Sequence, residues 1–132
     1  MMQELIFHIG GQQSVKEIQD WFSLQFPYLR INFFENMHLG PGVSGPGIKL
    51  LLPESLLKEF NPNMMDDELI IRDSTTVLAL EIFFKERLGL SVQILRKSGN
   101  LWLDTARSNS WTLMEQNLHG REISPQLSNK TG

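Results

Sequence analysis

The sequence contains two similar segments, and this internal repeat constrains the fold more than any other feature, because a repeated unit fixes an architecture. Residues 4–34 align with residues 68–95, and the turns between them differ by small deletions. The clearest match is between Glu4-Leu5-Ile6-Phe7 and Glu68-Leu69-Ile70-Ile71. The repeat therefore predicts a chain built from two copies of one unit, with a long insertion at residues 36–67.

Each segment has the pattern of a strand, a helix and a second strand, because its apolar period changes from about 2 to about 3.6 and back. Ser14 and Glu17 have the spacing of a capping box. Thr76 takes the corresponding position in the second segment, with Asp73 and Ser74 as alternative caps. Pro27 and Gly89 follow the two helical stretches and are residue types that end helices. Two such units predict a ferredoxin-like α+β fold, with a four-stranded antiparallel sheet and two helices on one face.

Further elements are expected outside the two aligned segments. The insertion contains a candidate strand at residues 48–52 and a short helix that begins after Pro53. After the second unit, a hairpin leads into an extra strand at residues 101–105. Thr112 then begins a last helix, which Gly120 is expected to end.

The length of 132 residues suits one domain, which we expect over residues 1–122, with a disordered tail at residues 123–132. The chain has no cysteine, which excludes disulfides, thiol nucleophiles and cysteine-ligated metals and suits a reducing compartment. Its start lacks the basic and apolar regions of a signal peptide, and no apolar run is long enough to span a bilayer. We therefore expect a cytoplasmic protein without a membrane segment.

A glycine- and proline-rich stretch at residues 39–47 includes Gly40, Gly42, Gly45 and Gly47. It lacks the Gly-Lys-Ser/Thr of a phosphate-binding loop, and no strand and helix flank it as in a dinucleotide-binding unit. The stretch is either an ordinary connection or a mobile functional loop. Catalytic triads, metal-binding motifs and cofactor motifs are also missing, so no cofactor and no metal are expected.

Strand alternation predicts which side chains lie on the sheet face opposite the helices. In a ferredoxin-like sheet the first and third strands are central, so His8 is expected beside or diagonal to Arg72. This mixed polar and apolar face is either ordinary surface, a ligand site or a subunit interface. Its candidate residues are Ile6, His8, Arg30, Asn32, Ile70, Arg72 and Gln93.

Two tryptophans, Trp102 and Trp111, lie near Arg107 in the C-terminal part of the chain. Such aromatic residues can stack on bases, anchor a protein partner or pack in the core. Nucleic acid is disfavoured as a partner, because 12 Lys and Arg against 15 Asp and Glu give a net charge of −3. The aromatic and glycine pattern of an RNA-recognition motif is also missing.

These features favour a cytoplasmic protein-interaction or oligomerisation module without catalytic activity, either a homodimer or a partner of another protein. The reason is that Ile6 and Ile70 would otherwise stay in water on the open sheet face. The alternative is a small-molecule-binding or enzymatic domain that uses the same face, with residues 39–47 as a lid. A fold of this kind serves many unrelated functions and does not decide between the two.

Overall fold

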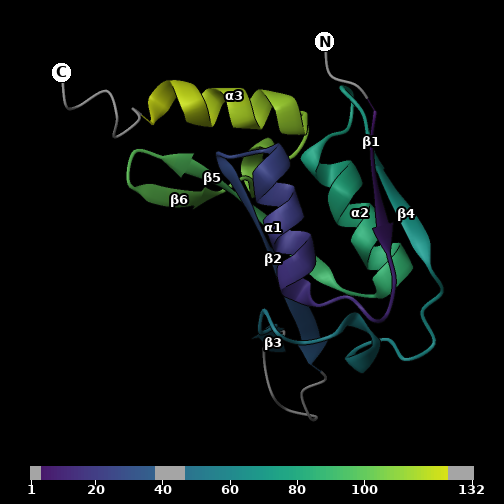
Figure 1. Cartoon of the computed structure of the whole chain (residues 1–132). Helices are drawn as coiled ribbons and strands as arrows, with labels where there is room; N and C mark the ends of the chain where they lie inside the picture. The colour runs from purple at the N-terminus through teal and green to yellow at the C-terminus, as the bar shows by residue number, and fades with distance from the viewer. Residues whose placement is uncertain (1–3, 38–46, 125–132) are drawn as a thin grey trace.

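The computed structural model describes residues 4–37 and 47–124. Within these residues the chain is a mixed α+β structure, as predicted, with three helices, six strands and two short 3-10 turns (Figure 1). The elements in chain order are β1 (Leu5–Ile9), α1 (Val15–Gln25), β2 (Leu29–Met37), β3 (Gly47–Leu50), η1 (Leu57–Glu59), β4 (Asp67–Ile71), α2 (Val77–Leu88), β5 (Ser91–Ser98), β6 (Leu101–Asp104), η2 (Ala106–Ser108) and α3 (Leu113–Ile123).

The strands form two antiparallel sheets, where the sequence predicted one. β1 and β4 pair with each other in a two-stranded ribbon, and the other sheet has the order β3-β2-β5-β6. In Figure 1 the ribbon lies on the right with α2 beside it, and β5 and β6 lie on the left below α3. The ferredoxin-like strand order is therefore wrong for the residues that the structure describes, because it would join β1 and β4 to β2 and β5 in one sheet.

The two pairings between the halves are centred on residues that the sequence aligns with each other. In the ribbon, Ile6 lies directly opposite Ile70. In the larger sheet, Asn32 lies directly opposite Gln93. A two-fold axis that passes through both pairs would produce this arrangement, since it exchanges each strand with its aligned counterpart.

The hairpin strands β3 and β6 take corresponding places in the two halves, although the sequence predicted the first as part of an insertion. β3 pairs with the end of β2, and β6 pairs with the end of β5. The contacts at the start of the two helices also correspond. The N–H of Val15 donates to the carbonyl of Ser55 (2.9 Å), and the N–H of Val77 donates to that of Trp111 (3.0 Å).

The predicted helix caps are confirmed. Ser14 accepts from the N–H of Glu17 and completes a capping box, and Thr76 accepts from the N–H of Ala79. α2 ends at Gly89, whose φ of 68° lies in the left-handed region where glycine carries no steric penalty. Local sequence therefore determines where these helices begin and end.

The prediction that Gly120 ends the last helix is wrong, because α3 continues to Ile123. Gly120 is buried, and a Cβ there would lie 2.9 Å from the Cβ of Tyr28 and 3.2 Å from the Cγ of Arg96. This glycine allows α3 to lie close against the sheet. The folded part also extends past the predicted boundary to the buried Ser124, and residues 125–132 of the predicted tail lie outside the described residues.

One hydrophobic core joins both sheets through α1 and α2. The ring of Phe7 in the ribbon stacks on Trp21 of α1, with centroids 4.5 Å apart. Phe33 of the larger sheet meets Phe84 of α2 edge-on at 5.1 Å. Strand alternation predicts eleven helix-facing residues, and nine of them are buried: Ile9, Leu29, Ile31, Phe33, Leu69, Ile71, Leu90, Val92 and Ile94. The other two, Leu5 and Phe7, are partly buried and pack against the core.

Replacing Phe84 by alanine should lower the free energy of unfolding by about 3–5 kcal/mol, because a fully buried ring is lost and a cavity remains. Urea denaturation measures this loss. The matched control is Leu24→Ala in α1, where the side chain is 75% exposed and a change within about 0.5 kcal/mol is expected. Equal midpoints for Phe84→Ala and wild type would contradict the described core.

Candidate functional site

The structure divides the predicted sheet face between two separate surfaces. Four of its residues lie on the side of the ribbon that faces away from the helices: Ile6, His8, Ile70 and Arg72. The others belong to the four-stranded sheet, where Trp102 joins them: Arg30, Asn32 and Gln93. Trp111 belongs to neither surface and lies in the turn before α3.

The first surface, here called the ribbon face, has two apolar residues between two charged ends. Ile6 and Ile70 lie opposite each other and are 54% and 37% exposed. At one end, Arg72 Nε lies 2.8 Å from a carboxylate oxygen of Glu4. The ribbon face therefore has a small exposed apolar centre with both signs of charge around it.

His8 and Arg72 lie at opposite ends of the ribbon, so the prediction that they are neighbours is wrong. His8 is paired with Glu68, and its Nε2 lies 3.5 Å from a carboxylate oxygen of Asp66. The reason is the antiparallel register about Ile6 and Ile70, which moves aligned residues away from the centre in opposite directions.

Both long edges of the ribbon lack a partner strand among the described residues. On the β1 edge, the side chain of Gln13 bonds to the carbonyl of His8 (2.7 Å) and to the N–H of Gly10 (2.8 Å). On the β4 edge, the N–H groups of Glu68 and Arg72 donate to the side chains of their neighbours Asp67 and Thr75 (both 2.8 Å).

These bonds show which backbone groups are free. Successive residues of an antiparallel strand direct their backbone groups to opposite sides. The N–H groups of Glu68 and Arg72 point away from β1. Ile70 is two residues from each of them, so its N–H and carbonyl also point away from β1. The N–H and carbonyl of Ile70 therefore lie at the open edge of β4.

The uncovered face of the four-stranded sheet is occupied by contacts among its own side chains. The guanidinium of Arg30 lies over the ring of Trp102, 4.1 Å from its centroid. The amide of Gln93 donates to a carboxylate oxygen of Asp104 (2.8 Å). These contacts hold Arg30 and Gln93 in place, and they leave the sheet face polar at its centre.

Glu81 of α2 lies near this polar group, at the edge of β5. Partial burial raises the pKa of Glu81 above its ordinary value of 4.5; the hydrogen bond from Asn109 (3.4 Å) lowers the pKa, and the negative charge of Asp104 raises it further. Gln19 occupies the aligned position in α1, where its amide donates to the carbonyl of Ile31 (3.0 Å). The first half thus has a neutral amide where the second has a carboxyl group.

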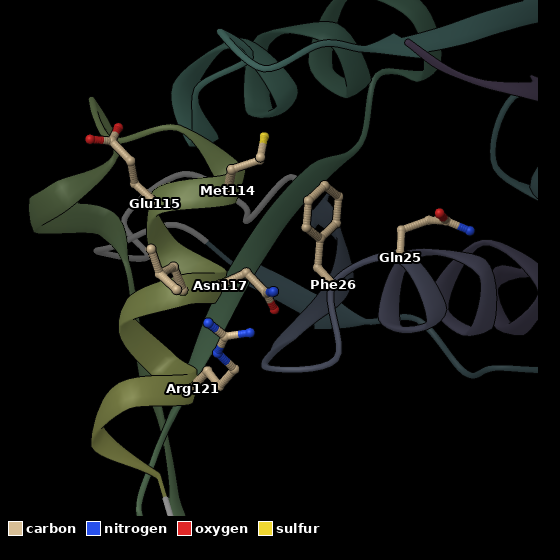
Figure 2. A pocket seen from close by; sticks show the side chains of 7 residues that line it. Gln25, Phe26, Met114, Glu115, Asn117 and Arg121 are labelled. Atoms are coloured by element: carbon tan, nitrogen blue, oxygen red, sulfur yellow. The ribbon is translucent and has the colours of Figure 1, made fainter. Parts of the chain in front are cut away.

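A groove between α1 and α3 is a further candidate that the sequence analysis missed. It has a volume of about 460 Å³, and its lining residues are Gln25, Phe26, Met114, Glu115, Asn117, Leu118 and Arg121. Figure 2 shows Met114, Asn117 and Arg121 reaching from α3 toward Phe26, whereas Glu115 turns away. One sequence signal could have indicated this groove: Met114, Leu118 and Arg121 have the spacing of residues on one face of a helix.

Trp111 helps to hold α3. Its ring meets that of His119 edge-on at 5.6 Å, and the Arg96 guanidinium lies 6.0 Å from its centroid. Arg96 also donates to the buried side chain of Gln116 (2.9 Å). These contacts join α3 to β5.

The predicted loop residues Gly40, Gly42 and Gly45 lie outside the described residues, and Gly47 begins β3. Among residues 4–37 and 47–124 there is no group of three or more His, Asp or Glu placed to hold a metal ion. No helix in this part of the chain is long and apolar enough to cross a membrane. Comparison with protein-family models, curated proteins and solved structures found no match.

Replacing Glu81 by glutamine should stabilise the fold increasingly as the pH rises above 4.5. A carboxyl group whose pKa is raised by folding binds its proton more tightly in the folded state, so its ionisation destabilises the fold between the ordinary and the raised pKa. The neutral amide has no such dependence. Since Glu81 is partly exposed, the gain should stay below about 1 kcal/mol. Urea midpoints of both proteins at acidic and neutral pH measure it, and a pH-independent difference would contradict it.

Proposed function

We propose that this chain is a cytoplasmic protein-interaction module without catalytic activity, and that it associates with a second copy of itself through the ribbon. The observation that carries the proposal is the pair of exposed isoleucines, Ile6 and Ile70, at the centre of the ribbon face. Complete burial of such a side chain contributes about 1.5–3 kcal/mol, and part of this is available to a complex that covers the pair.

The charges near the isoleucines are compatible with self-association. Two copies of Arg30 and Arg72 meeting in one interface would repel each other. Arg30, however, lies on the other sheet, stacked on Trp102, and Arg72 is paired with Glu4. The ribbon therefore presents no group of unpaired cations to a second copy.

We also infer that the two halves of the chain are copies of one unit that includes the hairpin strand. Three kinds of observation support this inference: the aligned sequences, the two pairings centred on aligned residues, and the matching contacts at the starts of α1 and α2. In this interpretation the chain resembles a fused dimer, in which β1 and β4 are the same strand of the two units.

Replacing Ile70 by lysine should abolish self-association, because the contact would lose its apolar pair and bring two ammonium groups next to each other. Analytical ultracentrifugation of wild type and variant over a series of concentrations measures this effect. Leu24→Lys is the matched control, since Leu24 is exposed on α1, away from the ribbon, and this variant should associate like wild type. A wild type that stays monomeric, or a dimer that tolerates Ile70→Lys, would refute the proposal.

The groove between α1 and α3 favours a second candidate function, the binding of a small apolar molecule with an acidic group. Its volume lies within the usual range for ligand sites of about 300–1,000 Å³. Arg121 at its rim has no ion-pair partner among the described residues. This location differs from the sheet face and the 39–47 lid expected from the sequence.

Anilinonaphthalene sulfonate, an apolar fluorescent dye with one anionic group, tests this second function. We expect saturable binding that Leu118→Asp weakens by at least about ten-fold, since a carboxylate would replace apolar lining. Leu78→Asp on α2 is the control, because Leu78 is exposed and does not line the groove. Equal dye binding by all three proteins would exclude the groove as the site.

A further inference from the structure

We propose that two copies of this chain join edge to edge through β4, forming a continuous antiparallel sheet of four strands in the order β1-β4-β4-β1. The inference rests on the self-association proposed above and specifies its geometry: the paired edges place the two Ile70 side chains side by side on one face, where each covers part of the other. Its partner is a second copy of the chain, related to the first by a two-fold axis that passes beside Ile70.

The edge of β4 is available for such a contact. In Figure 1, β4 lies at the margin of the molecule with no element beyond it. The N–H and carbonyl of Ile70 point outward there, and an unpaired strand edge is a template for another strand. When two such edges meet in antiparallel orientation, the two Ile70 residues form a hydrogen-bonded pair, with two backbone hydrogen bonds across the axis.

The charges on β4 and on Arg72, the residue that follows it, favour this register. In the segment Glu68-Leu69-Ile70-Ile71-Arg72, the two charged residues are equally distant from Ile70 and opposite in sign. Pairing about Ile70 therefore places Glu68 of each copy opposite Arg72 of the other, twice. Opposite charges in directly paired positions stabilise a sheet, and a shift by two residues would lose one or both pairs.

The chain already contains an analogous pairing. β1 meets β4 about Ile6 and Ile70, with Glu4 beside Arg72 and His8 beside Glu68. A second copy would repeat this arrangement on the other side of β4, so that four isoleucines form one row between two rows of charged and polar residues. The ribbon would gain the strand number at which sheets are ordinarily stable, since two strands alone are marginal.

The β1 edge is less suitable for the same contact. There the side chain of Gln13 occupies the His8 carbonyl and the Gly10 N–H, and so blocks one end of the edge. The β4 edge has the side chains of Asp67 and Thr75 on neighbouring N–H groups, and each edge is open at its centre, at Ile70 and at Ile6. Pairing about Ile6 would place Glu4 opposite His8, whereas pairing about Ile70 places a carboxylate opposite a guanidinium. Because the contact spans only the short segment from Glu68 to Arg72, we expect a weak, reversible dimer.

Charge reversal on the two edges provides the test. Glu68→Arg gives a strand with two cations, and Arg72→Glu gives a strand with two anions, so each variant should self-associate at least about ten-fold more weakly than wild type. In an equimolar mixture, the cations of one variant face the anions of the other. The mixture should therefore form a heterodimer, which analytical ultracentrifugation detects.

Glu122→Arg on the exposed face of α3 is the control for charge reversal as such and should associate like wild type. Circular dichroism checks that each variant is folded. An independent measurement needs no variant: exchange of the Ile70 amide proton in wild type should slow as the protein concentration rises, whereas that of Ile6 should not.

The outcomes separate this inference from the proposed function. A wild type that is monomeric at all concentrations refutes both. A wild-type dimer that neither variant weakens leaves self-association intact and overturns the β4 contact. Two monomeric variants whose mixture does not associate, or Ile70 exchange that is independent of concentration, also overturn the contact.

Discussion

Six pairs of residues join β2 to β5, and this antiparallel contact between the halves positions the rest of the molecule. On its inner side, Ile31 lies opposite Ile94 and Phe33 lies opposite Val92, and all four are buried. Each strand follows its helix after a short turn, so α1 and α2 must both lie over this apolar side. The core therefore forms between the halves, and neither half could bury its apolar helix face to the same extent alone.

The same contact explains why the ribbon is separate. β5 occupies one edge of β2, and side chains of α1 occupy part of the other: Ser23 donates to the Leu29 carbonyl (3.2 Å) and Gln19 to that of Ile31 (3.0 Å). In a ferredoxin-like sheet β4 would pair with β2 along that edge as well as with β1. With these carbonyls bonded to α1, and with β3 along the rest of the edge, β4 pairs with β1 alone, and the two cover the helices from another side.

Local features of the fold were predictable from sequence, but strand partners were not. Ser14 and Thr76 act within one turn of chain, so their residue types suffice to place the helix starts. The separation of His8 from Arg72 depends on the register between distant strands, which many alternating sequences satisfy equally well. Gly120 shows the same limit: its residue type suits a helix end, and only the nearness of Tyr28 reveals that it serves packing.

The candidate surfaces show the same difference between local features, which the sequence predicts, and strand partners, which it does not. Alternation correctly identified Ile6 and Ile70 as exposed apolar residues, because that pattern depends on one strand at a time. It wrongly placed Arg30 and Gln93 on the same face as these isoleucines, because that placement depends on which strands share a sheet. The α1–α3 groove required the packing angle of two helices, and no single segment contains that information.

The difference between the two edges of the ribbon determines the size of the proposed assembly. If both β1 and β4 were equally open, each dimer would still present unpaired edges, and strand addition could continue without limit. Gln13 covers one end of the β1 edge, and pairing about Ile6 would set Glu4 opposite His8. Pairing about Ile70 sets a carboxylate opposite a guanidinium twice, which favours the β4 edge. Because this contact uses the same edge of both copies, it closes at two copies.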